Sequence, residues 1–278
     1  MFVATSSEID LTFCGIALRA VTDELARYAR RPGADDTVRG ILPGLFEIAA
    51  RGRAMLADIL DARYADVSWG GDEMEPGLPL NTIEGRRWIY DPIDGAYHYI
   101  QGLPLWSASL ALVENGEVVL ALVYDPATNE MFAARRGART TLKGQTIAVS
   151  DKRVLGSAVV GTGLPIYGHG DPSVHATAVA QLAAVSGKVF VVRQMASASL
   201  QLAYVAAGRL DAHWETGYDL HDWTAGALLV REAGGCVTDF DGQPFEQGGN
   251  GILAGSKHFV DCLRDDILAP AAGERVRY

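Results

Sequence analysis

The chain has 278 residues, 49% apolar and 21% charged, which is usual for one large globular domain or two closely packed halves. Its formal net charge of -10 argues against a nucleic-acid polymer or an anionic membrane as the partner, because both bind basic surfaces. We expect a cytoplasmic protein, because the three cysteines are widely spaced and the sequence shows neither a basic leader nor an apolar run of bilayer length.

The first part of the chain, residues 1–150, is expected to combine N-terminal helices with an antiparallel sheet. Apolar residues recur at steps of three and four through residues 7–30, which predicts an amphipathic helix, and a second helix is predicted from about Pro43 to Leu60. Asn115-Gly116 between two apolar runs predicts a hairpin, because both turn residues tolerate positive φ. The predicted strands are residues 87–90, which run into Asp91, and residues 106–113, 118–124 and 131–135.

In the second part, residues 151–278, strands and helices alternate, which predicts a layered α/β architecture. We expect the two parts to form one compact unit. The predicted strands are residues 158–160, 189–192, 211–214, a short one at Val237, and 252–254. The predicted helices are residues 175–186, 197–207, 222–233 and a last helix capped by Ser256.

Two carboxylates three residues apart follow the first predicted strand, in Asp91-Pro92-Ile93-Asp94-Gly95. Pro92 fixes φ and lacks an N–H, so we expect the strand to end at Asp91 and the chain to turn. Such a turn could aim both carboxylates and the Ile93 carbonyl at one point, and Mg²⁺ prefers oxygen ligands of this kind. The alternative is a surface turn, which the spacing by itself favours, since Asp-Pro and Asp-Gly are common turn dipeptides.

This segment, with the histidine and aromatic residue that follow it, resembles the DPIDGT-x-[NH]-[FY] signature of the inositol monophosphatase family. A second segment, residues 221–235 (HDWTAGALLVREAGG), resembles the family's WD-x-A-[AG]-G…EAGG helix. The likeness extends from about Asp66 to Ala254. It implies an αβαβα sandwich of inositol monophosphatase/fructose-1,6-bisphosphatase type, a homodimer, and Mg²⁺-dependent hydrolysis of the phosphate monoester of a small sugar or polyol.

The resemblance also implies roles for individual residues. It implies two Mg²⁺ ions and a weak third, for which the usual upstream motif has no match between Val38 and Glu47. The implied metal ligands are Asp72, Asp91, Asp94, Asp222 and the Ile93 carbonyl. The implied catalytic residues are Asp72, Glu73 and Asp91, and the implied substrate-binding residues are Gly95, Ala96, Ser197, Ala198 and Glu215.

Two departures from the family pattern bear on activity. Asp72 stands where the family has a metal-bridging glutamate, and Ala96 stands where it has a threonine that orients the attacking water. Together with the missing upstream motif, these departures give an alternative function: a catalytically degenerate family member that binds a sugar phosphate or a protein. Two residues also have structural alternatives: Asp222 as an acid favoured by the helix dipole, and Glu215 as a solvated surface acid.

Overall fold

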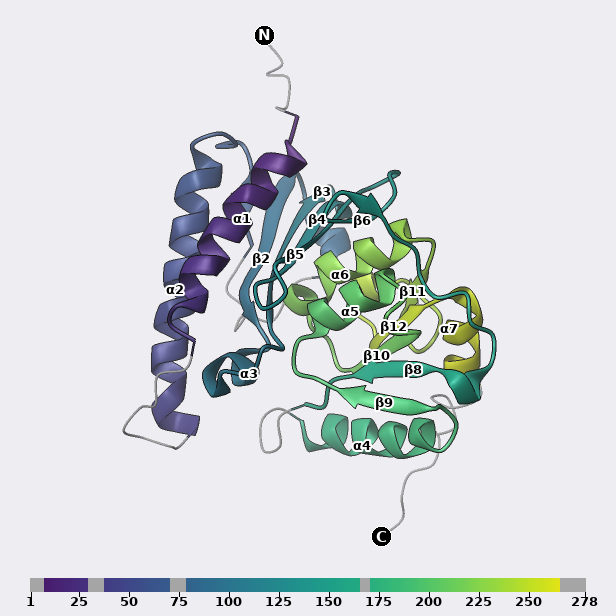
Figure 1. Ribbon diagram of the computed structural model, residues 1–278. Coiled ribbons are helices and arrows are strands. Elements are labelled where there is room, and N and C mark those ends of the chain that lie inside the picture. The colour runs from purple at the N-terminus through teal and green to yellow at the C-terminus, as the bar shows by residue number, and fades with distance from the viewer. Residues whose placement is uncertain (1–7, 30–37, 71–78, 166–170, 266–278) are drawn as a thin grey trace.

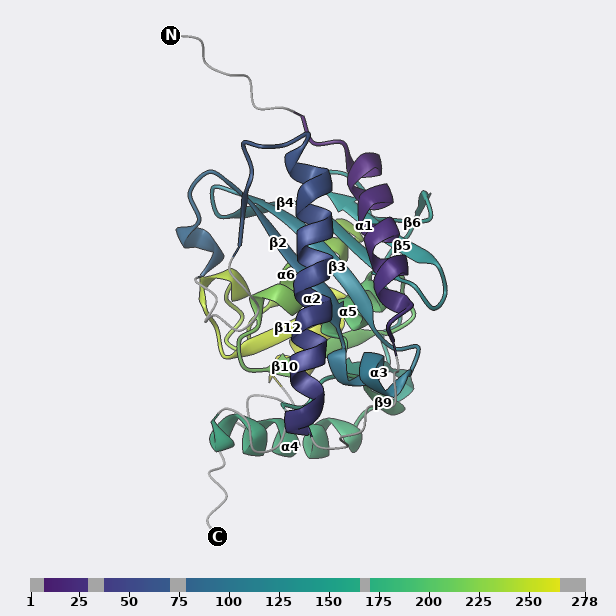
Figure 2. The ribbon, with the colours of Figure 1, turned by 90° about the vertical axis from the view of Figure 1, so that its left-hand side faces the viewer.

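Helices and sheets alternate in five layers (Figure 1), in a computed structural model that describes residues 8–29, 38–70, 79–165 and 171–265. Helices α1 and α2 cover one face of the first sheet, in front of it in Figure 2; α5 and α6 contact both sheets, and α4 and α7 pack on the far face of the second. This order confirms the predicted layered α/β sandwich. The helices are α1 Leu11–Ala26, α2 Val38–Asp61, α3 Ala96–Gln101, α4 Pro172–Ser186, α5 Ala198–Ala206, α6 Leu220–Glu232 and α7 Lys257–Leu263.

The first sheet has seven strands in the order of the chain, and all neighbours are antiparallel except β1 and β2. Asn115 and Gly116, with φ of 49° and 84°, form the tight turn between β3 and β4, which confirms the predicted hairpin. The strands are β1 Ser68–Trp69, β2 Arg86–Asp94, β3 Ser107–Glu114, β4 Glu117–Asp125, β5 Glu130–Arg135, β6 Thr141–Leu142 and β7 Gln145–Thr146.

The second sheet is mixed, with the strand order β11-β12-β10-β8-β9. Strand β8 runs parallel to β9 and β10, whereas β12 runs antiparallel to β10 and β11. Helix α4 lies in the chain between the parallel strands β8 and β9, as a parallel crossover requires. The strands are β8 Val159–Thr162, β9 Val191–Gln194, β10 Ala212–Thr216, β11 Cys236–Thr238 and β12 Gly251–Gly255.

Several predicted boundaries were wrong, and three of them lie in the first half of the chain. Helix α1 begins at Leu11 because Asp10 caps it, accepting hydrogen bonds from the N–H groups of Thr12 and Phe13. Helix α2 begins at Val38, before the predicted start, and contains Pro43, which has no N–H to donate within the helix. The strand expected to end at Asp91 continues to Asp94.

Helix α6 is buried on every side because it lies between the two sheets. From Leu220 to Val230, Asp222 is the one residue of this helix that is not fully buried. The apolar side chains around α6 belong to a core cluster that includes Val123 of the first sheet and Ile252 of the second. Despite such apolar helices, none in the described ranges is long and apolar enough to cross a membrane.

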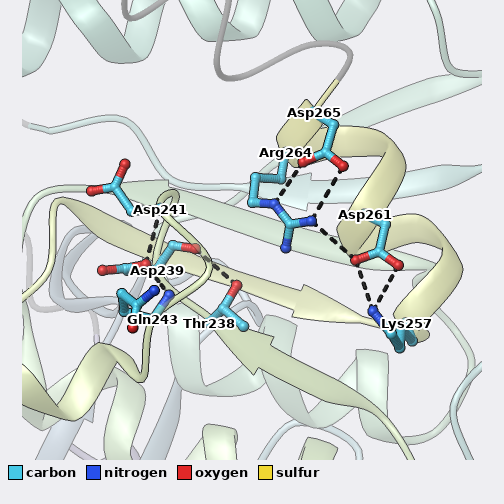
Figure 3. A network of polar contacts seen from close by, with 8 residues as sticks. All are labelled: Thr238, Asp239, Asp241, Gln243, Lys257, Asp261, Arg264 and Asp265. Atoms are coloured by element: carbon cyan, nitrogen blue, oxygen red, sulfur yellow. Dashed lines mark hydrogen bonds and ion pairs between the residues drawn. The ribbon is translucent and has the colours of Figure 1, made fainter.

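A group of charged and polar contacts lies around α7 and the turn after β11 (Figure 3). The Asp239 carboxylate closes the turn by accepting hydrogen bonds from the N–H groups of Asp241, at 2.9 Å, and Gln243, at 2.7 Å. On α7, the Asp261 carboxylate pairs with Lys257 at 2.8 Å and with Arg264 at 3.2 Å. Exposed pairs of this kind contribute little to stability, because water and salt screen the charges.

Candidate metal centre

A bulge in β2 brings two aspartates to the same side of the first sheet. Residues three apart in a regular strand point to opposite faces. Asp91 pairs with Ser109 and Asp94 pairs with Ser107, so β2 carries one extra residue between two paired positions. That extra residue returns Asp94 to the face of Asp91. Pro92 fits in the bulge because the interrupted ladder needs no N–H there.

The third aspartate comes from the first turn of α6. Asp91, Asp94 and Asp222 each present one carboxylate oxygen within 4.8 Å of the other two. Asp91 and Asp94 are buried, and Asp222 is partly exposed. Helix α6 packs on β2 and β3, where the Ser109 hydroxyl donates to the His221 carbonyl at 3.4 Å. The structure therefore brings together the three aspartates that the two sequence signatures indicate.

The two oxygens of the Asp94 carboxylate have different surroundings. Oδ2 accepts hydrogen bonds from the Ser197 hydroxyl at 2.8 Å, from the Ser199 N–H at 2.7 Å and from the Ser199 hydroxyl. Oδ1 is buried, and no described residue donates a hydrogen bond to it. Asp94 therefore has one oxygen fixed by donors from the start of α5 and one oxygen left for another ligand.

The donor set fits a hard divalent cation. Three carboxylates so close together repel one another when ionised, and burial makes this more costly unless a cation compensates. The buried Asp94 Oδ1 is the kind of polar atom that needs a partner. Carboxylate oxygens are also the ligands that Mg²⁺ prefers.

Metal binding should depend on pH through Asp94. Burial raises the pKa of Asp94 to about 7, although the hydrogen bonds from Ser199 and Ser197 act in the opposite direction. Because a ligand must be ionised, we expect Mn²⁺ affinity to fall by about tenfold per pH unit below neutrality and to level off above it. Calorimetric titrations between about pH 5.5 and about pH 8 test this, and an affinity independent of pH below neutrality would contradict it.

The raised pKa of Asp94 has the opposite effect on the stability of the metal-free protein, which should fall as the pH rises. Folding raises the pKa of Asp94 from 3.8 to about 7, so the folded state binds this proton more tightly than the unfolded state. The stabilisation is present at low pH and is lost as the pH rises through this window. Burial likewise raises the pKa of Asp219 to about 6. In EDTA, the melting temperature of Asp94→Asn should therefore fall less with rising pH than that of the wild type.

A short helix, α3, follows the metal motif directly. Gly95, the N-cap residue before it, has φ of 88°, a conformation that residues other than glycine rarely adopt. A Cβ at Gly95 would also lie 3.1 Å from Cβ of Ser197, so the starts of α3 and α5 lie against each other. Ala96 is the first residue of α3 and Ala198 is the first residue of α5. The four residues Gly95, Ala96, Ser197 and Ala198, all expected near the substrate, therefore lie close together at the starts of α3 and α5.

Glu215 lies close to the three aspartates, and its carboxylate contacts two other side chains. Its Oε2 accepts a hydrogen bond from the Trp223 indole at 3.1 Å and lies 3.6 Å from the buried His213 ring. A Cβ at Gly163 would lie 2.3 Å from Glu215 Oε1, so the absence of a side chain there makes room for the carboxylate. The negative charge of Glu215 contributes to raising the pKa of Asp94. The side chain is 18% exposed, which does not fit the alternative of a solvated surface acid.

Asp72 and Glu73, the two acids expected to hold the attacking water, lie outside the described residues. The sequence reasoning did not find Asp219, which caps α6 by accepting from the Asp222 N–H at 3.2 Å. An aspartate three residues before the first acid of a helix is an N-cap signal that could have revealed it. It also missed Ser107 and Ser199, for which no local pattern exists.

Comparisons with known proteins point to one family. A model of the inositol monophosphatase family matches residues 51–269. The inositol-1-monophosphatase of Rhizobium meliloti is 42% identical over 199 residues, which are 70% of this chain and 73% of that protein. The Nus factor SuhB of Haemophilus influenzae is 33% identical over 241 residues, 85% of this chain and 87% of that protein.

The fold is shared with solved structures as well. The structure of the Thermotoga maritima IMPase superposes with a TM-score of 0.78 at 30% identity, over 94% of this chain and 97% of that one. The suhB extragenic suppressor protein of Bartonella henselae gives a TM-score of 0.78 at 28% identity, over 96% and 99%. The family match covers most of the chain and includes all three clustered aspartates. This protein therefore belongs to the inositol monophosphatase family.

Proposed function

We propose that this protein is a Mg²⁺-dependent phosphatase that hydrolyses the phosphate monoester of a small sugar or polyol phosphate, as an inositol-1-monophosphatase does. The observation that carries the proposal is the cluster of Asp91, Asp94 and Asp222, whose carboxylate oxygens lie within 4.8 Å of one another. Family membership supports the reaction class, because this family acts on small phosphorylated substrates.

The proposed ligands of two Mg²⁺ ions are the three clustered aspartates, the Ile93 carbonyl and Asp72. Asp91 Oδ1 accepts a hydrogen bond from the Ile93 N–H at 2.9 Å, which fixes the carboxylate relative to the bulge. When bound, Mg²⁺ would withdraw charge from the phosphoryl and leaving oxygens and lower the pKa of a water molecule. The resemblance alone suggests a weak third ion.

The other proposed roles belong to groups of the chain itself. The first N–H groups of a helix have no partner within it, so the backbone at Gly95 and Ala96 could donate hydrogen bonds to a phosphate. Glu215, fixed by the Trp223 indole, would accept a hydrogen bond from a substrate hydroxyl. Ser197 and Ala198 are buried, so they would support the substrate site through the start of α5. Asp72 and Glu73 would hold the attacking water and accept its proton.

A second candidate function is binding without turnover. Several relatives carry the name Nus factor SuhB, including the one from Haemophilus influenzae that aligns with 85% of this chain. The alanine at position 96 and the aspartate at position 72 also depart from the family pattern. Such a protein would keep the aspartate cluster and bind a sugar phosphate or a protein partner.

A phosphate-release assay separates these two functions. Purified protein is incubated with a panel of inositol phosphates, other sugar phosphates and nucleotide bisphosphates, with Mg²⁺ or with EDTA. We expect release from at least one monoester, dependent on Mg²⁺ and lost in EDTA. No release from any member of the panel, together with retained binding of one of them, would favour the binding protein.

We also propose that the protein is a homodimer, as the resemblance implies. Sedimentation velocity at micromolar concentration tests this directly. A single species of 29.7 kDa, the mass of one chain, would exclude the dimer.

A further inference from the structure

Three buried serines surround the Asp94 carboxylate, and we name them the serine cluster: Ser107, Ser197 and Ser199. Their side chains are fully buried, and they come from two layers of the fold, strand β3 and the start of helix α5. The Ser107 hydroxyl lies 3.0 Å from that of Ser197 and 2.9 Å from that of Ser199. Ser107 is also the residue paired with Asp94 across the bulge.

We propose that Ser107 and Ser199 are positioning residues of the metal centre, which hold Asp94 Oδ2 so that Oδ1 alone faces the metal. The inference rests on the proposed metal site and goes further, since neither serine belongs to the sequence signatures. Three donors point at Oδ2, which has two lone pairs, so this oxygen has no direction left for a cation. Oδ1, buried and with no described donor, is the oxygen that remains.

The number of hydroxyl protons predicts a hierarchy between the two serines. When Asp94 is ionised it only accepts, so Ser197 and Ser199 both use their protons on Oδ2. Ser107 has one proton for its two serine neighbours. The Ser197 hydroxyl already accepts from the Leu200 N–H at 3.3 Å, which leaves the Ser199 oxygen as the better acceptor. Ser107 therefore acts on Asp94 mainly through Ser199.

Burial explains why such contacts influence the metal. In a low-dielectric interior, a fixed hydrogen bond orients a carboxylate more strongly than the same bond in water. Partners behind a metal ligand typically contribute about 10–100-fold to metal affinity. Because the Ser199 N–H and the Ser197 hydroxyl remain in Ser199→Ala, we expect a loss near the lower end, about 10-fold.

The test is a calorimetric titration with Mn²⁺ of the full chain, wild type and variants. We expect Ser199→Ala to weaken Mn²⁺ binding by about 10-fold and Ser107→Ala by less. In the double variant the loss should equal that of Ser199→Ala to within about twofold, because Ser107 acts through Ser199. With activity as a second readout, Ser199→Ala should raise the Mg²⁺ concentration for half-maximal rate and leave KM for the phosphate ester unchanged.

A matched control is Thr22→Val. Thr22 is another fully buried hydroxyl, bonded to the Leu18 carbonyl at 2.8 Å, but it lies on α1 on the opposite face of the first sheet. Thr22→Val should bind Mn²⁺ with the affinity of the wild type. A lower affinity in this variant would assign the effect to general destabilisation and overturn the inference. Melting curves in EDTA establish whether each variant is folded. If Ser199→Ala does not fold, the Mn²⁺ affinity of Ser107→Ala tests the inference in its place.

The possible failures are distinguishable with Asp94→Asn as a reference. If wild type binds Mn²⁺, Asp94→Asn loses binding and both serine variants bind normally, the positioning role is wrong and the metal site stands. If the losses of Mn²⁺ affinity in Ser107→Ala and Ser199→Ala add fully in the double variant, Ser107 does not act on Asp94 through Ser199. If the wild type itself does not bind Mn²⁺ or Mg²⁺, both the metal site and the positioning role are overturned.

Discussion

Asp94→Asn and Asp222→Asn should each abolish phosphate release and weaken Mn²⁺ binding by more than about 100-fold, the upper range for residues that only support a metal ligand. Each change removes one negative oxygen from a cluster in which the three carboxylates lie within 4.8 Å of one another. The fold should persist, because asparagine has nearly the same size and can keep accepting the hydrogen bonds of Asp94. In EDTA we expect both variants to melt at a higher temperature than the wild type, since the carboxylates no longer repel as strongly.

Calorimetry with Mn²⁺ measures the first effect and calorimetric melting in EDTA the second. Asp151→Asn is the matched control, because Asp151 is an exposed aspartate outside the cluster. It should change neither quantity. Unchanged Mn²⁺ affinity in both Asp94→Asn and Asp222→Asn would remove these residues from the metal site.

Ala96→Thr should raise kcat with little change in KM. The phosphate would meet the same backbone N–H groups and the same carboxylate cluster, so binding of the ground state should be similar. A threonine hydroxyl at the first position of α3 would help to orient the attacking water, and positioning of this kind can contribute about 100-fold. A change in kcat without a change in KM is typical of an interaction made mainly in the transition state.

Steady-state kinetics on the best substrate of the panel measure this, with Ala176→Thr on the exposed side of α4 as the control. Adding Asp72→Glu should increase the rate further, because the two side chains would then hold one water together. A lower kcat in Ala96→Thr would show that the site orients its water in another way. Absence of activity in the double variant as well would favour the binding protein.

Much of the fold was predictable because the relevant signals are local. Apolar periodicity located most of the helices and strands, and Asn115-Gly116 located the β3–β4 hairpin. The boundaries were less accurate because caps such as Asp10 and Asp219 act through a single side chain. A local pattern also could not show that the strand continues past Pro92, since the bulge is defined by pairing with β3.

The aspartates of the candidate site were predictable for a related reason. Asp91 and Asp94 are close in sequence, and Asp222 sits in a recognisable helix signature. The supporting contacts were not predictable, because they join distant segments: the Ser107 and Ser199 hydroxyls meet across 92 positions of the chain. Trp223 is part of the second signature, but only the folded arrangement shows its indole donating to Glu215.

Asp91, Asp94 and Asp222 are proposed to bind the divalent cation of a phosphatase. Crystals of the wild type soaked in Mn²⁺ and inorganic phosphate test it most directly through anomalous diffraction. We predict an anomalous peak about 2.0–2.3 Å from an oxygen of each of the three aspartates, including Asp94 Oδ1, with phosphate beside it. Strong Mn²⁺ peaks elsewhere on the protein and none within this cluster would show that the three aspartates do not bind the cation.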